Sequence, residues 1–91
     1  MKYMITLAGS AEAAKAMRSE EMKKEVGRLF EQIKPESIYF STIRRLIFIV
    51  ANIDDPHVEL RNVFEALSRF GETTIDPISS LEEFNRFIEQ L

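Results

Sequence analysis

The sequence predicts an α+β domain with a four-stranded antiparallel sheet, and two features lead to this prediction. Residues 46–51, LIFIVA, are apolar at every position and rich in β-branched side chains. That pattern is typical of a central strand that is buried on both faces and has a neighbour on each edge. Around it, shorter stretches of alternating polarity are interleaved with stretches whose apolar residues recur at helical spacing. The 91 residues form one expected domain, 1–91, because so short a chain cannot bury two cores.

The first strand is expected over residues 2–8, which alternate in polarity. Residues 11–33 have a helical composition, but Ser19 can cap a helix within this stretch, so the firmer helix is expected over 20–33. Gly27 in that helix costs about 1 kcal/mol relative to alanine, which suggests close packing against a neighbour. The earlier part carries a short apolar stripe, formed by Ala13, Ala14 and Met17.

Two strands and a helix make up the middle of the chain. Residues 36–42 form the second expected strand, and a tight connection near residues 42–45 leads into the central strand. Asp55 and Pro56 then mark a helix start, as N-cap and first helical residue. Gly71 is the expected stop signal at the C-terminal end of this helix.

The C-terminal part begins with a fourth strand over residues 72–78. Because Pro77 cannot donate to a β-ladder, this strand is expected at an edge of the sheet or to end there. Two overlapping capping boxes follow, with serines at 79 and 80 and glutamates at 82 and 83. They predict a last helix over residues 81–90, with an apolar side formed by Leu81, Phe84, Phe87, Ile88 and Leu91.

The resulting order is βαββαβ followed by a C-terminal helix. Right-handed crossovers would place both main helices on one face of the sheet and give the strand order 4-1-3-2. This order puts the third strand in the interior of the sheet, as its composition requires. The expected fold is a ferredoxin-like domain with an extra C-terminal helix.

Composition excludes several classes of function. The net charge of −3 gives no general attraction to nucleic acid or to an acidic membrane, so neither is an expected partner. The absence of cysteine excludes thiolate chemistry, and a single histidine cannot build a multi-histidine metal site. We expect no metal and no cofactor. No signal peptide or apolar run long enough for a membrane span is visible, so a cytoplasmic location is expected.

Several markers along nearly the whole chain resemble a family of short uncharacterised proteins. These are Lys34-Pro35-Glu36, Tyr39-Phe40, Asp55-Pro56, Asp76-Pro77 and Leu81. The family is placed with the ferredoxin-like dimeric α/β barrels, which include haem-degrading and quinol monooxygenases, lactone isomerases, stress-response proteins and effector-binding domains. The resemblance implies the fold and a homodimer. This sequence has no tryptophan and lacks the Asn/His/Trp set of the haem-degrading members, so haem oxygenation is not expected.

Two groups of charged side chains have both a functional and a structural interpretation. His57 could act as a general base beside the neighbouring aspartates, or it could be an exposed residue of a helix start. Arg44 and Arg45, at the turn between the second and third strands, could grip a carboxylate or phosphate. They could equally be edge charges that discourage aggregation. No phosphate-binding loop, catalytic triad or spaced carboxylate pair accompanies them.

The sheet face away from the helices is the more informative surface. Strand parity assigns to it either Leu46/Phe48/Val50 or Ile47/Ile49/Ala51 of the central strand. Such a surface is too apolar to stay wet, so it is expected to form a homodimer interface or to be covered by the C-terminal helix. Its remaining members are expected to be Met4, Thr6, Ala8, Tyr39, Ser41, Thr74 and Asp76.

The same face could hold a small apolar or aromatic ligand. Candidate ligand-binding side chains are Tyr39, Thr6, Thr74 and Asp76, and an arginine of a second subunit could pair with Asp76. The expected function is a small homodimeric binding or interaction module. The alternative is a cofactor-free monooxygenase or isomerase of the dimeric α/β barrel type, and whether the protein is an enzyme is left open.

Overall fold

The computed structural model describes residues 1–16, 18–41 and 43–91, apart from the side chains of residues 13, 14 and 16. Two predicted features lie outside this described part. One is the apolar stripe formed by Ala13, Ala14 and Met17, and the other is the first residue of the connection predicted over residues 42–45.

The described chain folds into a four-stranded sheet with helices, in the element order β-α-α-β-β-α-β-α. The elements are β1 Lys2–Gly9, α1 Ala11–Ala16, α2 Glu20–Ile33, β2 Ser37–Phe40, β3 Leu46–Asn52, α3 Pro56–Leu67, β4 Gly71–Pro77 and α4 Leu81–Glu89. All three strand pairs are antiparallel, so the predicted α+β class with a four-stranded antiparallel sheet is confirmed. The strand order is β2-β3-β1-β4, which reads 4-1-3-2 when counted from the β4 edge.

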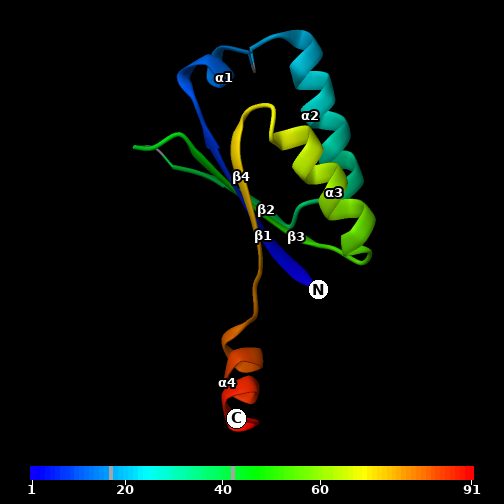
Figure 1. The fold of residues 1–91 in the computed structure, drawn as a ribbon, viewed down its shortest axis with the longest axis vertical. Helices are drawn as coiled ribbons and strands as arrows, with labels where there is room; N and C mark the ends of the chain where they lie inside the picture. The colour runs from blue at the N-terminus through cyan, green and yellow to red at the C-terminus, as the bar shows by residue number, and fades with distance from the viewer. Residues whose placement is uncertain (17, 42) are drawn as a thin grey trace.

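The core lies between one face of the sheet and the helices α2 and α3, which run side by side over that face (Figure 1). Ile5 of β1 stands opposite Ile49 of β3 in the ladder, and both side chains are fully buried. The helices contribute Leu29 and Val63, among others, to the same cluster. Alternation along the strands places apolar side chains on this face, and the helix stripes cover them.

The central strand is buried on only one of its faces within the chain. β3 has β1 and β2 as neighbours, as predicted. Ile49 and Ala51 are buried, whereas Leu46, Phe48 and Val50 point to the other face and stay half-buried. The prediction of burial on both faces is therefore wrong for the single chain, because α2 and α3 cover only one side of the sheet.

The start of α2 agrees with the predicted cap, but its glycine does not play the predicted role. The Ser19 side chain accepts a hydrogen bond from the Met22 backbone N–H at 3.2 Å, and the helix begins at the next residue, Glu20. Gly27 is exposed, and a Cβ placed on it would meet no atom within 4 Å. The expected close packing at Gly27 is absent because this residue lies on the solvent side of the helix.

The start of α3 agrees with the predicted N-cap, Asp55, and with Pro56 as first helical residue, but the side-chain hydrogen bonds there come from Glu59. Asp55 occupies the N-cap position but its side chain makes no capping hydrogen bond. The Glu59 carboxylate instead reaches back and accepts from the backbone N–H groups of Asp54 and Asp55, both at 3.0 Å. The helix ends at Leu67, and Gly71, predicted as its stop, is the first residue of β4.

The last helix stands apart from the rest of the chain. Ser80 and Glu83 form the capping box, the second of the two predicted pairs. Figure 1 shows α4 beyond the end of the sheet, past the last residues of β4. The radius of gyration, 14.7 Å, exceeds the value of about 12 Å for a compact chain of this length. The helix therefore does not cover the open face of its own sheet.

Candidate functional site

The open face of the sheet, defined here as the face away from α2 and α3, contains two cross-strand rows of interest. The ladder registers place Tyr39 opposite Phe48, Phe48 opposite Thr6 and Thr6 opposite Thr74. Asp76 stands opposite Met4 in the adjacent row. The structure therefore places all four predicted polar residues on this face.

These polar side chains do not converge on one point. Two strand spacings, about 10 Å, separate Tyr39 from Thr6, and the Phe48 ring lies between them in the row. Tyr39 is 63% exposed at its edge of the sheet, and Thr74 and Asp76 are exposed at the opposite edge. Thr6 and Thr74 are the only directly paired members of the predicted set among the described residues.

The two arginines lie at the other end of the sheet from Asp76. Leu46, next to Arg45, stands opposite Ala8, whereas Asp76 stands opposite Met4. Four residues of a strand span about 13 Å. An arginine of the same chain therefore lies far from Asp76, which is exposed and solvated.

His57 is separate from both groups. It occupies the first turn of α3 and is exposed. Because α3 follows the end of β3 that pairs with Lys2, His57 sits near the opposite end of the sheet from Arg44 and Arg45. The described structure brings no other predicted site residue next to it.

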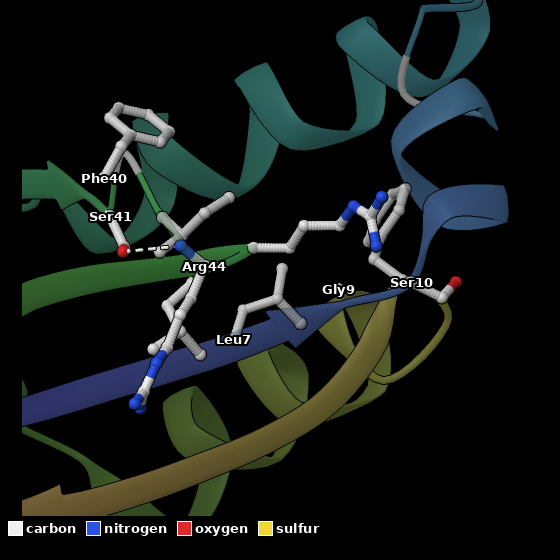
Figure 2. A pocket seen from close by; sticks show the side chains of 10 residues that line it. Leu7, Gly9, Ser10, Phe40, Ser41 and Arg44 are labelled. Carbon is white, nitrogen blue, oxygen red and sulfur yellow. Dashed lines mark hydrogen bonds between the residues drawn. The ribbon is translucent and has the colours of Figure 1, made fainter.

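A pocket of about 150 Å³ opens at the hairpin end of the sheet, and we call it the hairpin pocket. Figure 2 shows Phe40, Ser41 and Arg44 on its β2–β3 side, Gly9 and Ser10 on its other side, and Leu7 between them. The described residues that line it are Leu7, Gly9, Ser10, Phe40, Ser41, Arg44, Arg45, Leu46, Ile47 and Phe70.

Backbone hydrogen bonds hold the β2–β3 connection against the end of β1. The Gly9 N–H donates to the Arg45 carbonyl at 2.8 Å, and the Ser41 N–H donates to the Leu46 carbonyl at 2.9 Å. The Ser41 Oγ accepts from the Arg44 N–H at 3.0 Å. These bonds fix the backbone from which both arginine side chains extend, so the wall of the pocket is defined by the fold.

Apolar walls and two cations give the hairpin pocket its chemistry. Leu7, Phe40, Ile47 and Phe70 supply aliphatic and aromatic surface. Arg44 and Arg45 are exposed, and no ion pair with a described residue engages either guanidinium. No acidic, histidine, lysine or tyrosine side chain is among the described lining residues.

The sequence pattern singles out the arginines of this pocket but not the apolar residues of its walls. Ser41 was predicted on the open face, yet it lies beyond the end of β2 and lines the pocket. Phe70 follows α3 and reaches the site only through tertiary packing, since it joins the core cluster of Leu7. The one available signal was Phe40, a large aromatic residue that ends β2 and stays 67% exposed.

The described residues contain neither a membrane-spanning helix nor a cluster of side chains suited to a metal ion. In residues 1–16, 18–41 and 43–91, no helix has the length and apolar character needed to cross a bilayer. Within the same ranges no three His, Cys, Asp or Glu side chains gather in a way that could hold a metal ion.

Comparison with known proteins assigns the chain to no family. No protein-family model matches the chain, and no curated protein shows significant similarity to it. The family resemblance described for the sequence therefore rests on its residue markers alone.

Proposed function

We propose that the protein is a homodimeric binding module of the ferredoxin-like, dimeric α/β barrel type, and that the hairpin pocket receives a small aromatic or apolar ligand bearing an anionic group. The ligand proposal rests on one observation. The apolar walls of the pocket lie next to Arg44 and Arg45, and neither arginine has an anionic partner among the described residues.

The size of the pocket limits the ligand to about one aromatic ring. Apolar cavities of about 150 Å³ are large enough to hold benzene, and the hairpin pocket has this volume. Phe40 and Phe70 offer ring surfaces against which a planar ligand can pack. A benzoate-sized molecule therefore fits the apolar part.

The arginines favour an anionic group at the mouth of the pocket. Guanidinium groups bind carboxylates and phosphates through paired hydrogen bonds. Because both arginine side chains are exposed, each ion pair with the ligand would contribute only about 0.5–1 kcal/mol to the binding free energy. Affinity would come mainly from the apolar walls, and the arginines would select the sign of the ligand charge.

Binding is a better account of this pocket than proton-transfer catalysis. A general acid or base must lie within hydrogen-bonding distance of the proton that it moves. The polar side chains among the described lining residues are serines and arginines, and a guanidinium group supplies hydrogen-bond donors and no acceptor. The monooxygenase or isomerase alternative gains no support from this lining.

Titration with three ligands of equal size tests the ligand proposal. Benzoate, benzyl alcohol and benzylamine are added to ¹⁵N-labelled protein, and amide shifts are followed by NMR. We expect benzoate to shift the amides of Gly9, Ser41 and Arg45 and to bind roughly threefold or more tighter than benzyl alcohol. The Arg44→Gln/Arg45→Gln variant should lose this preference for the anion and keep binding of the alcohol.

The matched control is Arg28→Gln, which removes an exposed arginine from α2 and should leave the preference unchanged. Shifts confined to other parts of the chain, or equal affinity for the three ligands in the wild type, would contradict the ligand proposal.

The homodimer part of the proposal is supported by the open face. Met4, Ala8, Leu46, Phe48 and Val50 all project from it and are only half-buried. Apolar side chains that gather on one face without full burial are typical of a protein–protein contact. A second copy that covers this face would complete the burial of β3 that its all-apolar sequence predicts.

Phe48→Asp should therefore dissociate the dimer, because the interface would have to bury a carboxylate without a partner. The molar mass is measured by light scattering behind a sizing column at high micromolar concentration. We expect about twice 10.6 kDa for the wild type, and monomer or aggregate for Phe48→Asp. Val58→Asp, at an exposed position on α3, should keep the wild-type mass. A stable wild-type mass of 10.6 kDa would refute the dimer.

A further inference from the structure

We infer that helix α4 of each chain packs its apolar side against the open sheet face of a second copy, so that the two copies exchange their C-terminal helices. This inference rests on the proposed homodimer and goes beyond it, because it assigns the occupant of the face and the contact that α4 makes.

The first observation is that α4 stands apart from the sheet and the other helices of the described chain (Figure 1). It spans nine residues, and isolated helices shorter than about 12–15 residues are marginal in water. Every residue from Leu81 to Leu91 is exposed. The capping box of Ser80 and Glu83 contributes only about 1 kcal/mol. A stable α4 therefore requires a surface that covers its apolar side.

The apolar side of α4 is continuous and suited to such a surface. Five large apolar residues follow one another at spacings of three, three, one and three along α4 and the two residues after it, and their exposed fractions run from 49% to 86%. They are Leu81, Phe84, Phe87, Ile88 and Leu91. The polar residues between them lie on the other side of the helix, so one side is available for contact with a partner.

The second observation is that the connection directs α4 away from its own sheet. The Ile78 N–H donates to the Lys2 carbonyl at 2.9 Å, which continues the β1–β4 ladder past the end of β4. Ser80 then has an extended backbone, with φ −68° and ψ 164°, and is held by the capping box. Figure 1 shows the chain running on from β4 into α4 without turning back. Folding onto its own open face would require the chain to reverse at Ser79, between the ladder bond of Ile78 and the cap of Ser80.

The third observation is the area available. A buried aromatic side chain removes 150–250 Å² from water, so about half-exposed Phe84 and Phe87 can each contribute roughly 100 Å². The five apolar residues of α4 together offer roughly 500 Å², and two exchanged helices roughly 1,000 Å². With the area of the sheet faces added, the contact reaches the size of a stable protein–protein interface, about 1,200–2,000 Å².

Charge complementarity supports one arrangement of the two copies. α4 is acidic, with Glu82, Glu83 and Glu89 against Arg86, and it leaves the sheet at the end where β1 begins. Arg44 and Arg45 lie at the opposite end of the sheet. If a two-fold axis sets the β1 strands of the two copies antiparallel, the acidic helix of each copy lies toward the basic connection of the other, and the attraction is long-range, without a direct ion pair to Arg44 or Arg45.

Cross-linking between two different single-cysteine chains tests the exchange, since the natural sequence has no cysteine. Tagged Ile88→Cys and untagged Thr6→Cys proteins are mixed, refolded together and treated with a short bis-maleimide. We expect a cross-linked species with the mass of one tagged and one untagged chain. In a single chain carrying both substitutions, the main product should again be a covalent dimer. An intramolecular cross-link as the main product would mean that α4 folds over its own sheet, which would overturn the inference.

A charge introduced into the helix gives a second readout that does not depend on cysteine. Phe84→Asp should raise the dimer dissociation constant by about tenfold or more in analytical ultracentrifugation. Its control is Phe64→Asp on α3, because the two phenylalanines are 52% and 51% exposed. Circular dichroism should show a folded sheet in both variants.

The outcomes separate this inference from the proposed dimer. A wild-type monomer would defeat both. A wild-type dimer that is unaffected by Phe84→Asp and forms no mixed cross-link would leave the sheet-face dimer in place and overturn the helix exchange.

Discussion

Replacing Ile49 by alanine is expected to lower the free energy of unfolding by about 3 kcal/mol. Ile49 is 1% exposed and stands in the ladder between Ile5 on β1 and Ile38 on β2. Removing its side chain deletes buried apolar area and leaves a cavity, since sheet neighbours on both sides and helices above the face restrict collapse. Urea denaturation followed by circular dichroism measures the change.

Ile43→Ala is the matched control, because it makes the same substitution where the side chain is 94% exposed. Its free energy of unfolding should stay within about 0.5 kcal/mol of the wild type. Equal losses for the two variants would show that β3 does not anchor the core on its helix-facing side.

Gly71→Ala is expected to destabilise the fold by roughly 3 kcal/mol. Gly71 opens β4 and stands opposite Gly9 in the ladder, where the two strands approach closely. A Cβ on Gly71 would collide with the carbonyl of Ala8. The carbonyl atoms of Ala8 belong to the backbone, so they can move away from the added Cβ only if the end of the β1–β4 ladder shifts. Thermal and urea denaturation would report the loss.

Gly27→Ala gives the opposite expectation for the same chemical change. Gly27 is exposed inside α2 and has free space around the added methyl group. Alanine there should raise the free energy of unfolding by about 0.5–1 kcal/mol, because the unfolded chain loses conformational freedom and helix propensity improves. Destabilisation by Gly27→Ala would mean that α2 makes a contact absent from this structure, such as one across an interface between copies.

The local pattern of the sequence determined most of the secondary structure. Periodicity placed the strands and helices, and the side-chain caps at Ser19 and Ser80 fixed the starts of α2 and α4. These are short-range effects, in which a side chain bonds to a backbone group a few residues away. Pro77 likewise predicted the edge position of β4, because its missing N–H removes a ladder bond wherever the strand lies.

The same short-range reasoning did not predict the contacts that two other residues make. Asp55 is the N-cap of α3 as predicted, but its side chain makes no capping hydrogen bond, and the Glu59 carboxylate accepts from the backbone N–H groups of Asp54 and Asp55. Gly71 was the expected helix stop, but it serves a close strand approach to Ala8. The role of Gly71 depends on backbone atoms of β1, a distant element that no local pattern around Gly71 contains.

Tertiary structure alone decided which half of the central strand is left uncovered. Residues 46–51 are apolar at every position, so alternation could not tell the two faces apart, and only the position of α2 and α3 assigns Phe48 to the open face. The hairpin pocket is equally a product of packing, since Leu7, Phe40 and Phe70 come from three distant segments. The periodicity of the sequence predicts the apolar side of α4. Which surface that side can contact depends on the direction in which the chain leaves β4. A side chain is buried only when another element packs against it. In this protein the tertiary arrangement of the helices and strands therefore decides which apolar surfaces stay uncovered.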